Sequence, residues 1–181
     1  MKIVDLKVIP FWVPRKPYYY GEILPETRIV QTVTKIITDE GAEGYCFGGF
    51  IESDQDGLPA HQRAFLEDQV KPLVLGQDPY DPEKIWHWMW VANMPENILS
   101  VLDMALWDLQ ARAFDVPVHK LLGGCREKVK AYASTNHSMG APEVYAQHAL
   151  ECKSQGYRAY KIHPLYHYWD PVNKRPDLGR P

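Results

Sequence analysis

The sequence has few of the residues that mark disulfide-bonded, zinc-binding or membrane proteins. It contains three cysteines in 181 residues (Cys46, Cys125 and Cys152), which lie far apart and form no CxxC pair. An odd, scattered set argues against a disulfide framework or a cysteine-rich zinc site. No apolar run is long enough to span a bilayer. Asp5 stands where a signal peptide would need its apolar region, so we expect a cytoplasmic protein.

The sequence also lacks an excess of charge and the common catalytic motifs. Its net charge is −3 and its basic residues are scattered, so neither nucleic acid nor a membrane surface is an expected partner. There is no Walker motif, HExxH or GxSxG, and the glycine pairs Gly48–Gly49 and Gly123–Gly124 lack the strand-to-helix context of a phosphate loop. What remains is 45% apolar and 24% charged, which is ordinary for a globular domain.

The opening of the chain has the pattern of an antiparallel meander. Apolar and charged residues alternate over 4–8, which predicts a strand with one buried face. A loop rich in proline and tyrosine covers 14–25. Valine, isoleucine and threonine dominate 28–38, which predicts a second strand. Turn residues at 39–41 then lead to a third strand over 44–48.

Helices are predicted to follow the meander. One covers 59–70 and ends near Pro72, and a second begins at Asp81 with proline at its first position. The longest covers 95–114, where apolar residues recur at i, i+3 and i+4. We interpret four tryptophans as packing residues and two acids as surface or buried hydrogen-bonding groups; these are Trp86, Trp88, Trp90, Trp107, Asp103 and Asp108.

The pattern changes after Gly124. Residues 128–134 and 157–163 are predicted strands, and 142–155 is a predicted helix between them. Strand, helix, strand is a βαβ unit with a parallel pair. Because parallel sheets need both faces covered, two such strands are the beginning of a larger domain. The last stretch, 164–181, has the composition of a long loop. We therefore expect domains at 1–125 and 126–181, the second one incomplete.

The segment around the longest helix carries a family resemblance. Asp103-Met-Ala-Leu-Trp-Asp-Leu109 is followed by Pro117 and by Leu121-Leu-Gly-Gly124. This combination closely resembles a signature of the enolase superfamily, in its mandelate racemase and muconate-lactonizing branch. Ala111 departs from it, because relatives often have glycine there. The resemblance extends over the meander and the βαβ order, and so over essentially the whole chain.

The resemblance implies an α+β capping domain, the antiparallel meander plus helices, followed by the beginning of a TIM-like (β/α)7β barrel. Two capping loops close over the active site in such proteins, and they match 14–25 and 48–56 here. The family binds a divalent metal, usually Mg²⁺, through acids on the third, fourth and fifth barrel strands. Those strands are not in this sequence, so we expect the metal ligands downstream and none among these residues.

The same resemblance implies a catalytic pair at the end of the second barrel strand. Many relatives carry Lys-x-Lys there, and this sequence has Lys161-Ile162-His163. Alternation along a strand places Lys161 and His163 on one face, and strand ends line the active site of a barrel. Histidine, with an ordinary pKa of about 6.5, needs less help than lysine to act as a base near neutral pH. We expect His163 to transfer the proton or bind substrate, and Lys161 to hold a carboxylate. The pair could instead bind hydroxyl groups while a base on a later strand does the chemistry.

Residues of the loops and strand ends are further candidates for substrate contact. They are Tyr18, Tyr19, Tyr20, Phe50, Glu52, Thr135, Asn136 and His167. Several have a competing structural interpretation: ring packing for the tyrosines, a solvated surface for the glutamate, and turn chemistry after the first barrel strand for Thr135 and Asn136. Nothing in the sequence fixes the position of His167.

The resemblance implies removal of the proton alpha to a carboxylate, with an enediolate stabilised by the metal. The polar loops favour a dehydratase that acts on acid sugars, a small carboxylate substrate. We also expect the full-length enzyme to be a homo-oligomer. A racemase or a lactonizing cycloisomerase is the alternative within the superfamily. The alternative of another class is a non-catalytic truncated fragment or interaction module.

Overall fold

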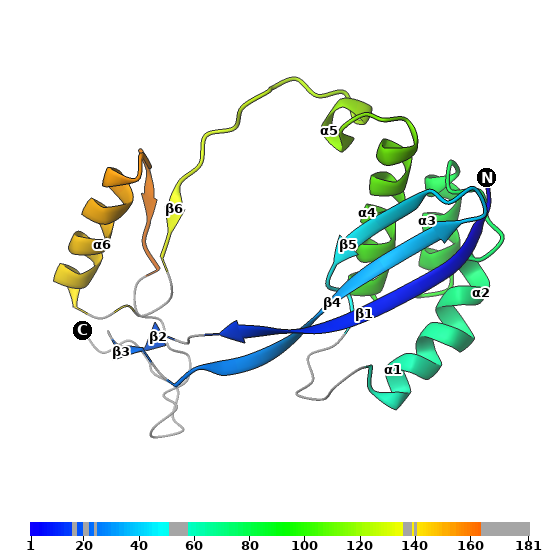
Figure 1. The fold of residues 1–181 in the computed structure, drawn as a ribbon, viewed down its shortest axis with the longest axis horizontal. Coiled ribbons are helices and arrows are strands. Elements are labelled where there is room, and N and C mark those ends of the chain that lie inside the picture. The colour runs from blue at the N-terminus through cyan, green and yellow to red at the C-terminus, as the bar shows by residue number, and fades with distance from the viewer. Residues whose placement is uncertain are drawn as a thin grey trace. The chain divides into compact units, whose positions relative to one another are not determined.

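A computed structural model describes residues 1–15, 18–19, 22–23, 25–50, 58–135, 139 and 141–163, and Figure 1 shows their elements. The elements are β1 (Ile3–Arg15), β2 (Tyr18–Tyr19), β3 (Glu22–Ile23), β4 (Thr27–Thr38), β5 (Glu43–Phe47), α1 (Ala60–Phe65), η1 (Leu66–Val70), α2 (Lys71–Val74), α3 (Pro82–Val91), α4 (Glu96–Ala113), α5 (Val118–Leu121), β6 (Ala133–Ser134), α6 (Pro142–Ser154) and β7 (Tyr160–Lys161). They form two compact units, one of Met1–Val13 with Arg28–Cys125, the other of Pro14–Thr27 with the chain from Arg126.

The first unit is built on a sheet with the strand order β1-β4-β5. β4 and β5 are antiparallel, with Thr34 opposite Cys46, and the predicted α+β capping fold is confirmed. Alternate residues of β4 are buried, as its sequence pattern predicts. The buried hydroxyl of Thr32 donates to the carbonyl of Gly48 or Phe50, at 3.1 and 3.0 Å, and so ties the segment after β5 to the middle strand. β1 is longer than predicted and extends into the expected loop as far as Arg15.

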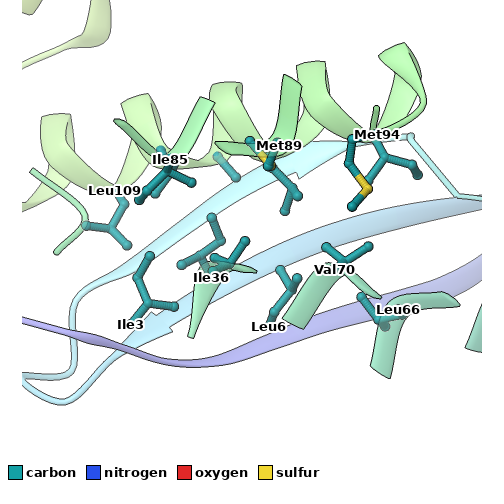
Figure 2. Packing of buried hydrophobic residues seen from close by; sticks show 14 of the residues in the cluster. Ile3, Leu6, Ile36, Leu66, Val70, Ile85, Met89, Met94 and Leu109 are labelled. Carbon is teal, nitrogen blue, oxygen red and sulfur yellow. The ribbon is translucent and has the colours of Figure 1, made fainter. Parts of the chain in front are cut away.

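Helices α1 to α4 and the sheet enclose one hydrophobic core (Figure 2). Ile3 and Leu6 of β1 and Ile36 of β4 meet Ile85 and Met89 of α3 there, and each is at most 1% exposed. Fully burying side chains of this size contributes roughly 1.5–3 kcal/mol each before conformational entropy is counted.

The first predicted helix does not end at Pro72. It continues through the π turn η1 into α2, which has Pro72 in its first turn. Proline has no N–H and its ring clashes with the carbonyl four residues earlier in a regular helix. In the π turn the N–H of Lys71 donates to the carbonyl of Leu66, five residues back, and this wider turn accommodates the proline. The predicted end near Pro72 assumed a regular helix. The π turn lets the helix continue past this proline to Val74.

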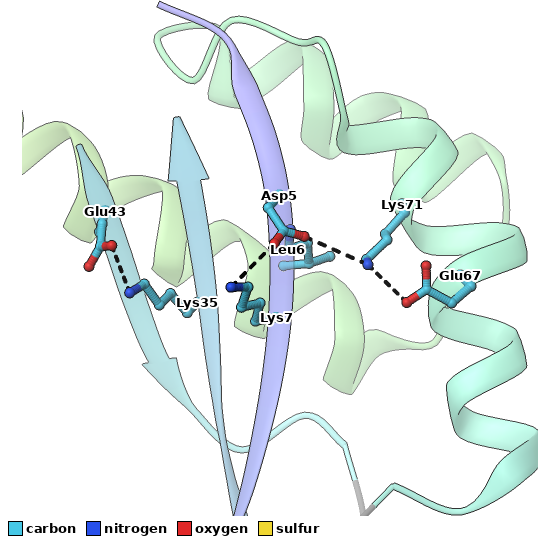
Figure 3. A network of polar contacts seen from close by, with 7 residues as sticks. All are labelled: Asp5, Leu6, Lys7, Lys35, Glu43, Glu67 and Lys71. Atoms are coloured by element: carbon cyan, nitrogen blue, oxygen red, sulfur yellow. Dashed lines mark hydrogen bonds and ion pairs between the residues drawn. The ribbon is translucent and has the colours of Figure 1, made fainter. Parts of the chain in front are cut away.

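Ion pairs join this helical segment to the sheet (Figure 3). Lys71 Nζ lies 2.8 Å from Glu67 and 3.7 Å from Asp5 of β1. On the same sheet, Lys35 Nζ of β4 lies 2.7 Å from Glu43 of β5. Because the carboxylates are partly exposed, solvent screens these pairs and we expect each to contribute little to stability.

Three of the tryptophans interpreted as packing residues are partly exposed. Trp86, Trp88 and Trp90 of α3 are 36%, 38% and 60% exposed. The buried face of α3 is formed by Ile85 and Met89, one turn apart, so the neighbouring tryptophans fall on other faces. Trp86 and Trp90 stack on each other, with 6.3 Å between ring centroids.

Helix α4 confirms the predicted apolar stripe and packs across β5. Gly44 of β5 makes this approach possible, because a Cβ there would lie 2.1 Å from the carbonyl oxygen of Ala105. Asp108 accepts a hydrogen bond of 2.9 Å from the N–H of Tyr45 and one of 2.7 Å from Arg112 Nε. Its predicted hydrogen-bonding role is thus confirmed. Trp107 is half-buried on the same helix.

The second unit contains the predicted parallel pair, in which Ser134 of β6 lies opposite Lys161 of β7. Both strands are shorter than predicted, with two residues each, although α6 matches its expected range. Val129 is 83% exposed and Tyr132 is 53% exposed, so apolar residues that suggested a longer strand are largely open to solvent. Across the part of the chain that the structure describes, no helix is long and apolar enough to cross a membrane.

Candidate functional site

The ends of β6 and β7 bring a threonine and a histidine together. The N–H of Ala133 donates to the carbonyl of Ala159 at 3.0 Å, and the N–H of Thr135 donates to that of Lys161 at the same distance. Because the strands are parallel, their carboxyl ends lie at one edge of the sheet. Thr135 and His163 follow the last paired residues at that edge.

His163 is held by Thr135 through both main chain and side chain. Its N–H donates to Thr135 Oγ1 at 2.8 Å. Its ring Nδ1 lies 2.8 Å from the carbonyl oxygen of Thr135 and 3.4 Å from Oγ1 of the same residue. His163 is half-buried and Thr135 is 6% exposed. The contacts fix the ring relative to the end of β6.

Tyr145 of α6 adds a second restraint on the same residue. Its hydroxyl donates to the carbonyl of His163 at 2.9 Å and accepts from the N–H of Met139 at 3.0 Å. Tyr145 is 8% exposed, so the hydroxyl has both hydrogen bonds in a setting with little water. The sequence alone did not indicate Tyr145, because the spacing of a single tyrosine on a helix does not show which group its hydroxyl contacts.

Lys161 is exposed and lies two residues before His163. Its Nζ is 5.9 Å from the centroid of the Tyr132 ring, within the range of a cation–π contact. β7 ends at Lys161, and the shared face of Lys161 and His163 stays a prediction from strand alternation.

The remaining predicted contacts are only partly described. Tyr18 and Tyr19 form β2 and pair antiparallel with β3, Tyr18 opposite Ile23. Tyr20, Glu52, Asn136 and His167 lie outside the described residues.

Phe50 belongs to the core cluster and is 3% exposed. It also lines a cavity of about 550 Å³ together with Gln62, Asp68 and Asn97. Gly49 beside it has a φ of +90°, and a Cβ there would lie 2.8 Å from Val101, so the backbone passes tightly against α4. Phe50 is thus fixed in the core, and its contact with substrate stays a prediction.

Side chains that could bind a metal do not cluster among the described residues. Within the described ranges, no group of three histidine, cysteine, aspartate or glutamate side chains is placed to hold an ion. The residues of this chain that the structure describes therefore do not form a metal site by themselves.

Residues 23–123 match the N-terminal domain of the mandelate racemase/muconate lactonizing enzyme family. The chain belongs to this family. It is thereby a member of the enolase superfamily, as the resemblance around α4 predicted.

Curated relatives of this enolase-superfamily chain include dehydratases. The chain is 32% identical over 136 residues to the D-galactonate dehydratase family member RspA of Halomonas elongata, which covers 71% of this chain and 32% of the relative. It is 30% identical over 135 residues to D-mannonate dehydratase of Sphingomonas sp., with the same coverage of 71% and 32%. The chain thus spans about a third of the length of these relatives.

Solved structures of the superfamily show the same fold. D-glucarate dehydratase of Agrobacterium tumefaciens, in complex with magnesium, superposes with a TM-score of 0.71 at 29% identity, over 94% of this chain and 45% of that one. A 2-chloromuconate cycloisomerase of Rhodococcus opacus superposes with a TM-score of 0.69 at 18% identity, over 90% and 45%. The second likeness concerns the fold alone.

Proposed function

We propose that the full-length protein is a metal-dependent dehydratase of acid sugars. The observation that carries the proposal is the histidine held just after β7, in a chain similar to a D-galactonate dehydratase family member, a D-mannonate dehydratase and a D-glucarate dehydratase. In this proposal 1–125 is the capping domain, and 126–181 supplies the first two strands of a (β/α)7β barrel. A racemase or cycloisomerase remains the alternative within the superfamily.

The proposed chemistry assigns one task to each residue of the pair. His163 takes the proton from C2 of the substrate, and the electron pair of the broken C–H bond enters an enediolate. Loss of the C3 hydroxyl as water, with a proton from an acid, then gives an enol that tautomerises to a 2-keto acid. Lys161 holds the substrate carboxylate by charge. A positioned base of this kind contributes about 10²–10⁴ to the rate.

Magnesium would stabilise the negative charge of the enediolate as a Lewis acid. The described residues do not form its site, and in this family the ligands are acids on later strands. No step assigned to His163 or Lys161 depends on the geometry of the ion.

A product screen tests the proposed function. Full-length protein with Mg²⁺ is incubated with a panel of aldonic and aldaric acids, and 2-keto acid is measured as its semicarbazone. We expect one or a few acids to yield product, and removal of the metal with EDTA to abolish it. Exchange of the C2 proton without keto product would favour the racemase or cycloisomerase. Neither product nor exchange with any acid would favour the non-catalytic alternative.

A further inference from the structure

We propose that Thr135 and Tyr145 are positioning residues that hold His163 with a proton on Nδ1, so that the ring exchanges protons through Nε2. The catalytic meaning of this arrangement rests on the proposed function, but the arrangement itself does not. In this inference Thr135 positions His163 and does not contact the substrate. Tyr145, which was not a candidate from the sequence, has the same positioning role.

The carbonyl of Thr135 selects the tautomer. A backbone carbonyl oxygen can only accept hydrogen bonds, and it lies 2.8 Å from His163 Nδ1. An unprotonated Nδ1 would set a lone pair against that oxygen, so Nδ1 carries the proton. This holds for the neutral ring and for the imidazolium, since Nδ1 is protonated in both. The proton that comes and goes is therefore the one on Nε2, in keeping with the rule that the hydrogen bond at one ring nitrogen sets the state of the other.

Two further hydrogen bonds hold the main chain of His163, and so keep its ring next to the Thr135 carbonyl. Thr135 Oγ1 accepts from the N–H of His163 at 2.8 Å, and Tyr145 donates to the carbonyl of the same residue at 2.9 Å. Both main-chain polar groups of His163 therefore have a hydrogen-bond partner, the N–H in Thr135 just after β6 and the carbonyl in Tyr145 of α6. Thr135 and Tyr145 are 6% and 8% exposed, so water competes little for these bonds, and losing one leaves a buried group unpaired.

The inference can be tested without turnover by nuclear magnetic resonance. Full-length protein labelled with ¹⁵N-histidine is compared with His163→Gln, which identifies the signals of this ring. At a pH where the ring is neutral, we expect a protonated signal from Nδ1 and an unprotonated one from Nε2. The opposite pattern would overturn the inference.

Variants test the roles of the two side chains. Thr135→Val removes Oγ1 at nearly constant volume, and Tyr145→Phe removes only the hydroxyl. We expect each to lower kcat by roughly ten- to a hundredfold, the scale of a small misplacement of a catalytic group, while KM changes little. The Nδ1 and Nε2 signals should move toward a tautomer mixture. Thr135→Ser should restore both readouts, and Tyr157→Phe, on a residue 41% exposed, is the matched control.

The outcomes separate this inference from the proposed function. A rise in KM with kcat unchanged in Thr135→Val would make Thr135 a substrate ligand and overturn its positioning role. If no acid is turned over but the ring shows Nδ1–H, the function fails and the held tautomer stands. If a substrate is dehydrated but the ring shows Nε2–H, the function stands and this inference fails. The wild-type spectrum decides the tautomer even if a variant does not fold.

Discussion

At the scale of single residues, the three cysteines lie in different surroundings. Cys125 is exposed, Cys152 is buried and Cys46 on β5 is intermediate. Burial raises the pKa of the Cys46 thiol, and the negative charge of Asp108 raises it further. Because the thiolate is the reactive form, Cys46 has a smaller reactive fraction at neutral pH than an ordinary thiol.

This environment predicts slow alkylation of Cys46 that continues to accelerate as the pH rises above the ordinary thiol range. Asp108→Asn removes the charge but keeps an oxygen that can accept from Tyr45, so it should increase the rate at pH 8. Asp115→Asn, on an exposed acid, should leave the rate unchanged. Peptide mapping after timed iodoacetamide treatment measures this. An unchanged rate in Asp108→Asn would contradict the electrostatic part of the account.

At the scale of elements, α4 connects the sheet to the rest of the capping unit. Leu106 faces the core at 0% exposure, whereas Met104 on the same helix is 49% exposed. Leu106→Ala should lower the free energy of unfolding by about 2–5 kcal/mol, through lost burial and a cavity. Met104→Ala should change it by less than about 0.5 kcal/mol, as at most surface sites. Urea denaturation of the full-length protein checks both, and similar losses would show that α4 packs in another register.

Local periodicity predicted those elements whose own residues define a buried face. The alternation in β4 and the stripe of α4 are of this kind, because each pattern is read within one segment. Other features depend on how one element packs against another, and the spacing of residues within one segment does not encode this. They are the π turn before Pro72, the exposed tryptophans of α3 and the close approach of α4 at Gly44. At the site, Lys161 and His163 were found through a motif. The hydrogen bond from Tyr145 to the carbonyl of His163 forms only when α6 packs next to the end of β7.

At the scale of the whole molecule, this chain contains a capping unit and one parallel strand pair. The region it matches is 32% of the length of each of the two dehydratase-family relatives described above. The described residues hold a candidate base and its supports, but no metal cluster. We propose that activity and substrate choice are properties of the full-length protein, and that this protein is a homo-oligomer.

The measurement that tests the account most directly is proton abstraction by the full-length protein with and without His163. The substrate identified in the screen is deuterated at C2, and release of deuterium into water is followed for wild type, His163→Ala and the exposed-histidine control His87→Ala. We predict that His163→Ala slows release more than about a hundredfold, with an unchanged Tm, and that His87→Ala does not. Release by His163→Ala within about threefold of wild type, far below the effect expected for a general base, would contradict the account and place the base on a later strand.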